Sequence, residues 1–128
     1  MNAVMWAAGT GTRLGSAAAE KPPKVLLQFG GKSLLQRHIE LLRQHDIEEL
    51  VLGVGYHQDE IEQEIAALCA EDFVRTVFNK DYNDGNIVTL WTLRDELCCG
   101  RPVLLMDADV LYDEDLLSRL VYSQHKNC

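Results

Sequence analysis

Two groups of residues in this chain have the types and spacing that phosphate chemistry needs. The first is the segment Ala8-Gly9-Thr10-Gly11-Thr12-Arg13, which is followed by Lys24 after two prolines. Glycines let the backbone approach a phosphate closely with several N–H groups, and an arginine fork can hold a pyrophosphate. Pro22 and Pro23 stiffen the approach of Lys24, which suits a cation that must stay aimed. The segment therefore predicts a site for the phosphates of a nucleotide.

The second group is a pair of carboxylates, Asp107 and Asp109, which directly follows the apolar run 103–106. On an extended chain, residues i and i+2 face the same side, so we expect both carboxylates to point into one site. Hard oxygen ligands suit Mg²⁺, which usually takes one or two carboxylates together with phosphate oxygens. The alternative is a solvated turn or a helix cap. We prefer that alternative for Asp113 and the metal site for the pair.

Glycine spacing alone leaves several kinds of nucleotide site open. A dinucleotide fingerprint needs G-x-G-x-x-G opening directly into a helix, but here the third glycine, Gly15, comes one place late and a Pro-Pro loop follows. A Walker A loop ends in G-K-[ST], which Gly31-Lys32-Ser33 supplies, but Leu26 stands where its first glycine belongs. A merely flexible loop is the third alternative. The residues around the glycines must decide between them.

The elements that would position these residues alternate between strand and helix. Short apolar runs predict buried strands at 3–8, 50–54, 73–78 and 103–106, with a further extended stretch at 25–29. Amphipathic runs predict helices at 33–44, 58–68, from the polar loop 79–86 to about residue 97, and at 114–122. Ser33 and Asp113 are the expected N-caps of the first and last of these helices. His38 belongs to the apolar stripe of the first. This order predicts an α/β fold with a mostly parallel sheet, and ligands at the carboxyl ends of its strands.

Composition limits the classes of function. The 128 residues suffice for one domain, and a net charge of −8 argues against a nucleic-acid binder. No apolar run approaches the ~20 residues of a membrane span, and no signal peptide is evident. Because neither is evident, we expect a cytoplasmic protein. The four cysteines lack metal or disulfide spacing.

The glycine segment gains specificity from its neighbours: G-x-G-x-R-L at 9–14 combines with P-K-x-L at 23–26. This combination resembles the signature of the sugar-phosphate nucleotidyltransferase superfamily. The resemblance implies a Rossmann-like domain, related to the GT-A glycosyltransferase fold, with helices on both faces of the sheet. It implies that Gly9 to Arg13 hold the β- and γ-phosphates that leave as pyrophosphate, with Arg13 and Lys24 as the catalytic cations. It also implies that Mg²⁺ binds after strand 103–106, with Asp109 the first choice of ligand and Asp107 the second.

A polar segment points to one branch of that family. Residues 79–90 resemble the N-x-x-Y-x-x-x-N-x-x-S-L segment of the choline-phosphate cytidylyltransferase-like branch, with Thr89 in place of the usual Ser. The resemblance implies that Asn86 and Thr89 lie beside the nucleotide, where they could cap the helix and hydrogen-bond to base or ribose. A polar loop with a helix cap is the alternative. The preference for CTP rests on this segment.

The resemblance covers nearly the whole chain but only the first part of the family domain. We therefore expect residues 1–128 to form the nucleotide-binding part, with the acceptor-binding part absent. An exposed sheet edge would favour a homo-oligomer.

The expected reaction is transfer of an NMP, CMP first, from an NTP to a phosphorylated small molecule, with release of pyrophosphate. Phosphocholine, a phosphonate and a sugar phosphate remain open as acceptors. The alternative is a non-catalytic nucleotide-binding or regulatory module, or an inactive fragment. A dinucleotide-dependent oxidoreductase is disfavoured because Gly55-Tyr56-His57 follows strand 50–54 without a ribose-binding acid.

Overall fold

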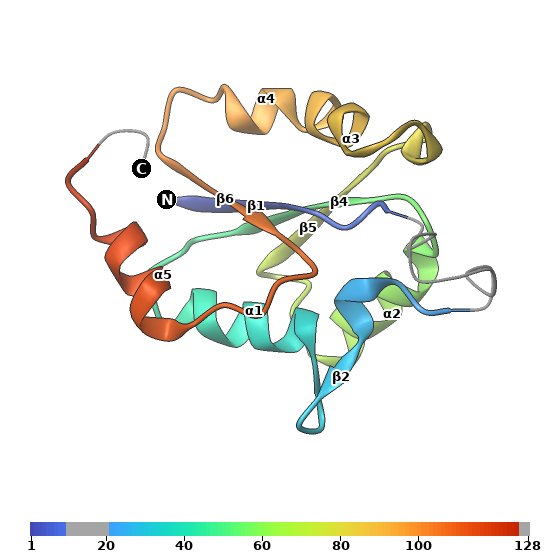
Figure 1. Ribbon diagram of the computed structural model, residues 1–128, viewed down its shortest axis with the longest axis horizontal. Helices are drawn as coiled ribbons and strands as arrows, with labels where there is room; N and C mark the ends of the chain where they lie inside the picture. The colour runs from blue at the N-terminus through green and yellow to red at the C-terminus, as the bar shows by residue number, and fades with distance from the viewer. Residues whose placement is uncertain (10–20, 126–128) are drawn as a thin grey trace.

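Four parallel strands form the central sheet of the computed structural model, which describes residues 1–9 and 21–125. They are β1 (Asn2–Trp6), β4 (Leu50–Val54), β5 (Val74–Phe78) and β6 (Val103–Asp107). Their order across the sheet is β5-β4-β1-β6, and every neighbouring pair is parallel (Figure 1). All five residues of β4 are buried, as expected for an apolar strand covered on both faces. The predicted mostly parallel sheet is confirmed.

Helices cover both faces of this sheet (Figure 1). On one face lie α1 (Leu34–Arg43), α2 (Gln58–Ala67) and α5 (Glu114–Val121), and on the other lie α3 (Asn86–Thr92) and α4 (Arg94–Leu97). The connections from β1 to β4 and from β4 to β5 run through α1 and α2, whereas the return to β6 runs through α3 and α4. Right-handed crossovers place helices on opposite faces when the direction of strand addition reverses in this way.

The two faces of the sheet have cores of unequal size. Side chains alternate along β1, so Ala3 and Met5 belong to the main core under α1, α2 and α5. Val4 points to the opposite face, where it joins a small cluster with Val51 and Leu93. The core between the sheet and the helices α3 and α4 is therefore the smaller of the two.

The chain between β1 and α1 differs from the expected extended stretch at 25–29. It forms a 3-10 helix, η3 (Lys24–Leu26), because the N–H groups of Leu26 and Leu27 bond back to the carbonyls of Pro23 and Lys24 at 2.9 and 3.1 Å. A two-stranded hairpin follows, made of β2 (Gln28–Phe29) and β3 (Lys32–Ser33). Gly30 and Gly31 form its turn with φ of 59° and 78°, a region that glycine enters without steric cost.

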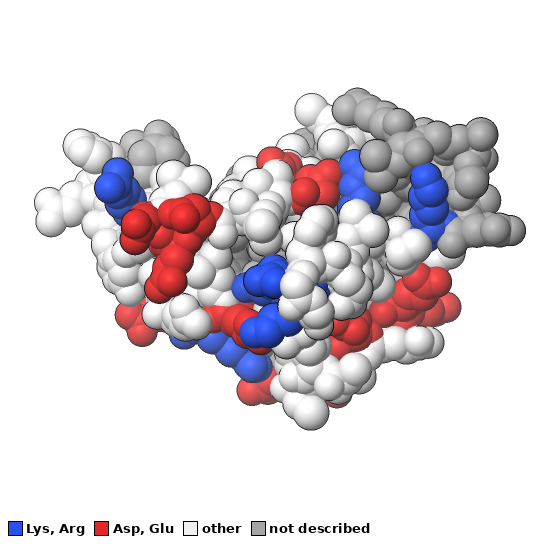
Figure 2. Space-filling view, turned by 60° about the horizontal axis from the view of Figure 1, so that its bottom comes forward, with Lys and Arg blue, Asp and Glu red and all other residues white. Residues whose placement is uncertain are grey.

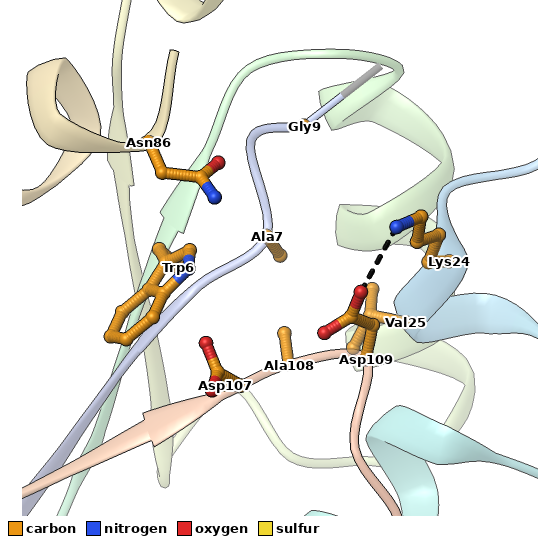
Figure 3. Close-up of a pocket in the computed structure, with 9 residues that line it drawn as sticks. All are labelled: Trp6, Ala7, Gly9, Lys24, Val25, Asn86, Asp107, Ala108 and Asp109. Atoms are coloured by element: carbon orange, nitrogen blue, oxygen red, sulfur yellow. Dashed lines mark hydrogen bonds and ion pairs between the residues drawn. The ribbon is translucent and has the colours of Figure 1, made fainter. Parts of the chain in front are cut away.

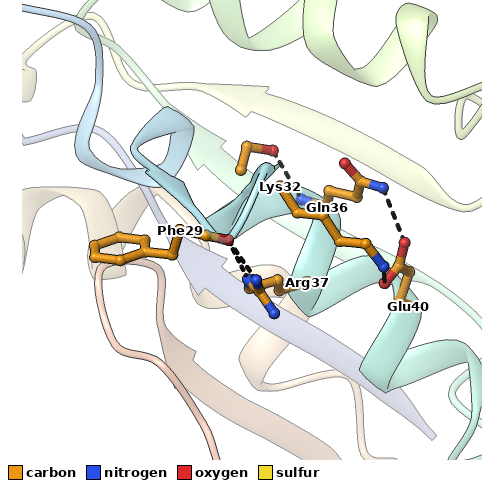
Figure 4. Close-up of polar contacts among 6 residues, drawn as sticks. Phe29, Lys32, Gln36, Arg37 and Glu40 are labelled. Carbon is orange, nitrogen blue, oxygen red and sulfur yellow. Dashed lines mark hydrogen bonds and ion pairs between the residues drawn. The ribbon is translucent and has the colours of Figure 1, made fainter.

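Polar contacts join this hairpin to the first turns of α1 (Figure 4). Ser33 caps the helix as predicted, because its Oγ accepts a hydrogen bond from the Gln36 N–H at 3.1 Å. Lys32 pairs with Glu40 at 2.8 Å and lowers the pKa of that carboxyl. The Arg37 guanidinium donates to the carbonyl of Phe29. These contacts therefore fix the segment that leads from Lys24 to the start of α1.

The segment 79–97 differs from the single helix that was expected after a loop. A 3-10 turn, η4 (Tyr82–Asp84), precedes α3, and the chain bends at Leu93, where φ is −88° and ψ is 4°. Asn86 is not the cap: Gly85 occupies that position with φ 103° and without a side-chain hydrogen bond. Asp113 does cap α5, since its carboxylate accepts from two backbone N–H groups.

The charged surface is mixed on the face that carries α1 and α5. Figure 2 shows Lys and Arg side chains lying among Asp and Glu side chains on this face. Within the described ranges, none of the helices is long and apolar enough to cross a membrane.

Gly53 sets how closely α3 approaches the sheet. A Cβ built on Gly53 would lie 2.9 Å from Leu93 Cδ1 and 3.0 Å from Thr89 Cγ2. We predict that Gly53→Ala lowers the free energy of unfolding by about 1–3 kcal/mol, the usual cost of overpacking, measured by urea denaturation. Thr89→Ser removes one of these two methyl groups and should recover part of the loss in the double variant. Additive losses would contradict this account of the contact.

Candidate functional site

The order of strands reverses between β1 and β6. The chain leaves β1 in the direction of β4 and β5, and β6 is added later on the other side of β1. Connections that diverge in this way leave a crevice at the carboxyl ends of the two strands. An open pocket lies there (Figure 3). It is lined by Trp6, Ala7, Gly9, Lys24, Val25, Asn86, Asp107, Ala108 and Asp109.

Five residues singled out in the sequence come together in this pocket: Gly9, Lys24, Asn86, Asp107 and Asp109. They come from four separate segments, namely the loop after β1, η3, the start of α3 and the end of β6 (Figure 3). The topology of the sheet thus joins the two motifs that carry phosphate and metal chemistry.

The remaining predicted residues lie elsewhere or outside the described part of the chain. Ala8 is buried next to Gly9 but does not line the pocket. Thr10, Gly11, Thr12 and Arg13 lie outside the described residues.

Thr89, like Ala8, is a predicted nucleotide-binding residue that does not line the pocket. Only 2% of its surface is exposed, and its Oγ1 accepts a hydrogen bond of 3.0 Å from Asn79 Nδ2 in the interior. It lies one turn after Asn86 on α3 and faces the sheet at Gly53. Its place in the fold is therefore that of a packing residue of α3 rather than of the pocket wall.

Lys24 and Asp109 form the central polar contact of the pocket. The Lys24 ammonium donates to Asp109 Oδ2 at 3.0 Å, and their side chains are 34% and 45% exposed. Their neighbours Val25 and Ala108 are both buried in the main core, which fixes the backbone on each side. An ion pair this exposed contributes only about 0–1 kcal/mol to stability. The pair therefore matters for the positions of the two charges in the pocket rather than for the stability of the fold.

The two carboxylates reach different parts of one pocket (Figure 3). β6 ends at Asp107 and the chain turns at Ala108 and Asp109, so the rule for extended chain does not apply. Asp107 lies toward Trp6 and Asp109 toward Lys24, yet both line the same pocket (Figure 3). Among the described residues, no group of three or more His, Cys, Asp and Glu could hold a metal by itself. Two carboxylates alone fit Mg²⁺, which completes its shell with phosphate oxygens and water.

The acidic turn is held by two residues to which the sequence analysis gave no role in the site. His38 of α1 bonds through Nε2 to the Ala108 carbonyl at 3.1 Å, so this nitrogen must carry the proton. The Tyr112 hydroxyl accepts the N–H of Asp107 at 2.9 Å. Burial lowers the pKa of His38, and burial raises the pKa of Tyr112. The signal in the sequence was a histidine within the apolar stripe of a helix, where a buried polar group needs a partner.

Comparison with known families identifies the domain type. The model of the MobA-like NTP transferase domain matches residues 3–127. Choline-phosphate cytidylyltransferase of Streptococcus pneumoniae is 36% identical over 110 residues, which are 85% of this chain and 44% of that protein. CTP:phosphoglutamine cytidylyltransferase of Campylobacter jejuni is 27% identical over 131 residues, which are 98% of this chain and 50% of that protein. The chain thus spans about half the length of these curated relatives.

Solved structures agree with this fold. The CTP:phosphocholine cytidylyltransferase of Streptococcus pneumoniae superposes with a TM-score of 0.70 at 31% identity, covering 89% of this chain and 49% of that one. The inositol-1-phosphate CTP transferase of T. maritima gives a TM-score of 0.74 at 23% identity, covering 98% and 49%. The second likeness supports the fold alone.

The His38 contact predicts a pH dependence of stability. Because burial lowers the pKa of His38 in the fold, the unfolded chain binds a proton more readily, near pH 6.5. The contribution of neutral His38 to the free energy of unfolding is therefore fully present above about pH 6.5. It is lost as the pH falls from there through the lowered pKa. Melting temperatures between pH 8 and pH 5 should fall more steeply for the natural chain than for His38→Gln. Equal slopes would show that His38 does not titrate in this way.

Proposed function

This chain belongs to the MobA-like NTP transferase family, and we propose that it transfers a nucleoside monophosphate from CTP to a phosphorylated small molecule, releasing pyrophosphate. Relatives named as choline-phosphate and phosphoglutamine cytidylyltransferases support CTP as the donor. A third, the CMP-5'-(3-aminopropyl)phosphonate synthase of Streptomyces rubellomurinus, is 28% identical over 120 residues. These names leave the acceptor as phosphocholine, a phosphonate or a similar phosphate ester.

One observation carries the proposal: Lys24 and Asp109, 85 residues apart in sequence, meet in one pocket beside Gly9. The pocket thus offers a cation, carboxylates and a glycine whose backbone is open to a ligand. Among the residues that the structure describes, none would come within 4 Å of a Cβ on Gly9. Such a combination suits a nucleotide triphosphate.

The proposed chemistry needs positioning and charge stabilisation rather than a covalent intermediate. An oxygen of the acceptor phosphate attacks the α-phosphorus of CTP, and the bond to the bridging oxygen breaks as pyrophosphate leaves. Negative charge accumulates on the phosphate oxygens during this exchange, so the Lys24 ammonium stabilises it. Arg13 keeps its proposed role at the leaving pyrophosphate.

The carboxylates fit a divalent cation in this reaction. Asp109 and Asp107 would hold Mg²⁺, which neutralises phosphate charge when bound. Asp109 also accepts the hydrogen bond from Lys24, so it orients that ammonium toward the pocket. Asn86 lines the same pocket and offers an amide to the nucleoside.

We predict that Lys24→Ala lowers the rate of pyrophosphate release about 10²-fold or more, on the scale of losing one preorganised electrostatic contact. The assay contains CTP, Mg²⁺ and phosphocholine or 2-aminoethylphosphonate. The melting temperature should hardly change, because the Lys24–Asp109 pair is exposed.

Arg119→Ala is the matched control, since it removes an exposed cation from α5, away from the pocket. A rate in Lys24→Ala equal to that of this control would refute the role of Lys24. If the protein binds CTP but releases no pyrophosphate with either acceptor, a non-catalytic nucleotide-binding module would be favoured instead.

A further inference from the structure

The geometry points to Trp6 as the platform on which the base of the nucleotide stacks, an inference that rests on the proposed function. No role was expected for this residue beyond its place in an apolar strand. It nevertheless lines the pocket at the carboxyl end of β1 (Figure 3).

The pocket has two chemically different sides. Lys24 and Asp109 lie on one side, and Trp6 and Asn86 lie on the other (Figure 3). A nucleoside triphosphate has the same division, with several negative charges at one end and an uncharged planar base at the other. The phosphates belong beside the ammonium of Lys24, so the base is directed to the side with the indole and the amide.

Trp6 is held in place by the sheet. In the register of the strands it lies beside Asp107 on β6 and Gly53 on β4, and residues paired in this way point to the same face. The indole packs against the small cluster of Val4, Val51 and Leu93 and is only partly buried. An aromatic ring that is already fixed loses little conformational entropy when a ligand stacks on it.

Asn86 adds a polar partner on the same side. It is the first residue of α3, it is exposed, and its side chain lies over the region of Trp6 (Figure 3). An amide carries both donors and an acceptor, so it can pair with the edge of a base whose face rests on the indole. Stacking supplies affinity for any base, and the amide supplies choice between bases.

The chain allows a direct optical test. It contains two tryptophans, and Trp91 is 69% exposed and does not line the pocket. In a Trp91→Phe background, Trp6 is the only indole, and its emission reports contact with a base. We would titrate this protein with CTP and with inorganic tripolyphosphate, each with Mg²⁺, correcting for absorption with free tryptophan amide.

CTP should quench the Trp6 emission, and tripolyphosphate should bind with little quenching. Trp6→Leu should weaken CTP binding roughly 5- to 150-fold, the range for losing one stacked base. Its affinity for tripolyphosphate should stay unchanged, which also shows that the variant folds. Trp6→Phe should retain much of the CTP affinity.

Equal quenching by the two ligands, or an equal loss of both affinities in Trp6→Leu, would overturn the inference. Quenching by phosphocholine but not by CTP would also overturn it, in favour of a cation site beside Asp107. Normal pyrophosphate release with a silent Trp6 would refute the stacking and leave the proposed function standing. Base-dependent quenching without pyrophosphate release would refute the function and leave the stacking standing, and absence of CTP binding would refute both.

Discussion

The reversal of strand order between β1 and β6 is the constraint on which the site depends. Parallel strands must be joined by crossovers, and right-handed crossovers send the helices before and after the reversal to opposite faces. The backbone that follows β1 therefore diverges from the backbone that follows β6, and the pocket lies between them. Lys24 and Asp109 meet there, and their neighbours Val25 and Ala108 are buried in the same core.

A second constraint is electrostatic. The chain carries a net charge of −8, and two of its carboxylates line the pocket proposed to receive a triphosphate. Left alone, Asp107 and Asp109 would repel such a ligand. A bound divalent cation would remove that conflict, and Lys24 offsets part of it without any ion because it pairs with Asp109. The acidic pair is thus compatible with phosphate binding only as part of a mixed-charge site.

The sequence predicted those features that follow from local patterns. Ser33 and Asp113 cap their helices because a side-chain oxygen before an amphipathic run has N–H groups within reach. The wholly apolar run Leu50–Val54 forms the buried strand expected of it. Tertiary contacts account for what the local patterns did not show: Thr89 is buried because α3 rests on Gly53, and Asp109 reaches Lys24 because the chain turns after β6 ends at Asp107. Trp6 was missed because a strand pattern does not show which side chain stands at the sheet's open end.

The parts of the pocket differ in how firmly they are held, and this difference matches their proposed tasks. Trp6 and Asp107 stand at the ends of paired strands, so their positions follow from the register of the sheet. Lys24 instead extends from a single turn of 3-10 helix, and its exposed pair with Asp109 contributes little to stability. Breaking that pair therefore costs little stability, so a phosphate can bind the Lys24 ammonium in place of Asp109 without disturbing the fold. In the proposed transfer the nucleotide must be held while the bond between its phosphates breaks. A rigid wall for the base and an exchangeable cation for the phosphates suit that reaction.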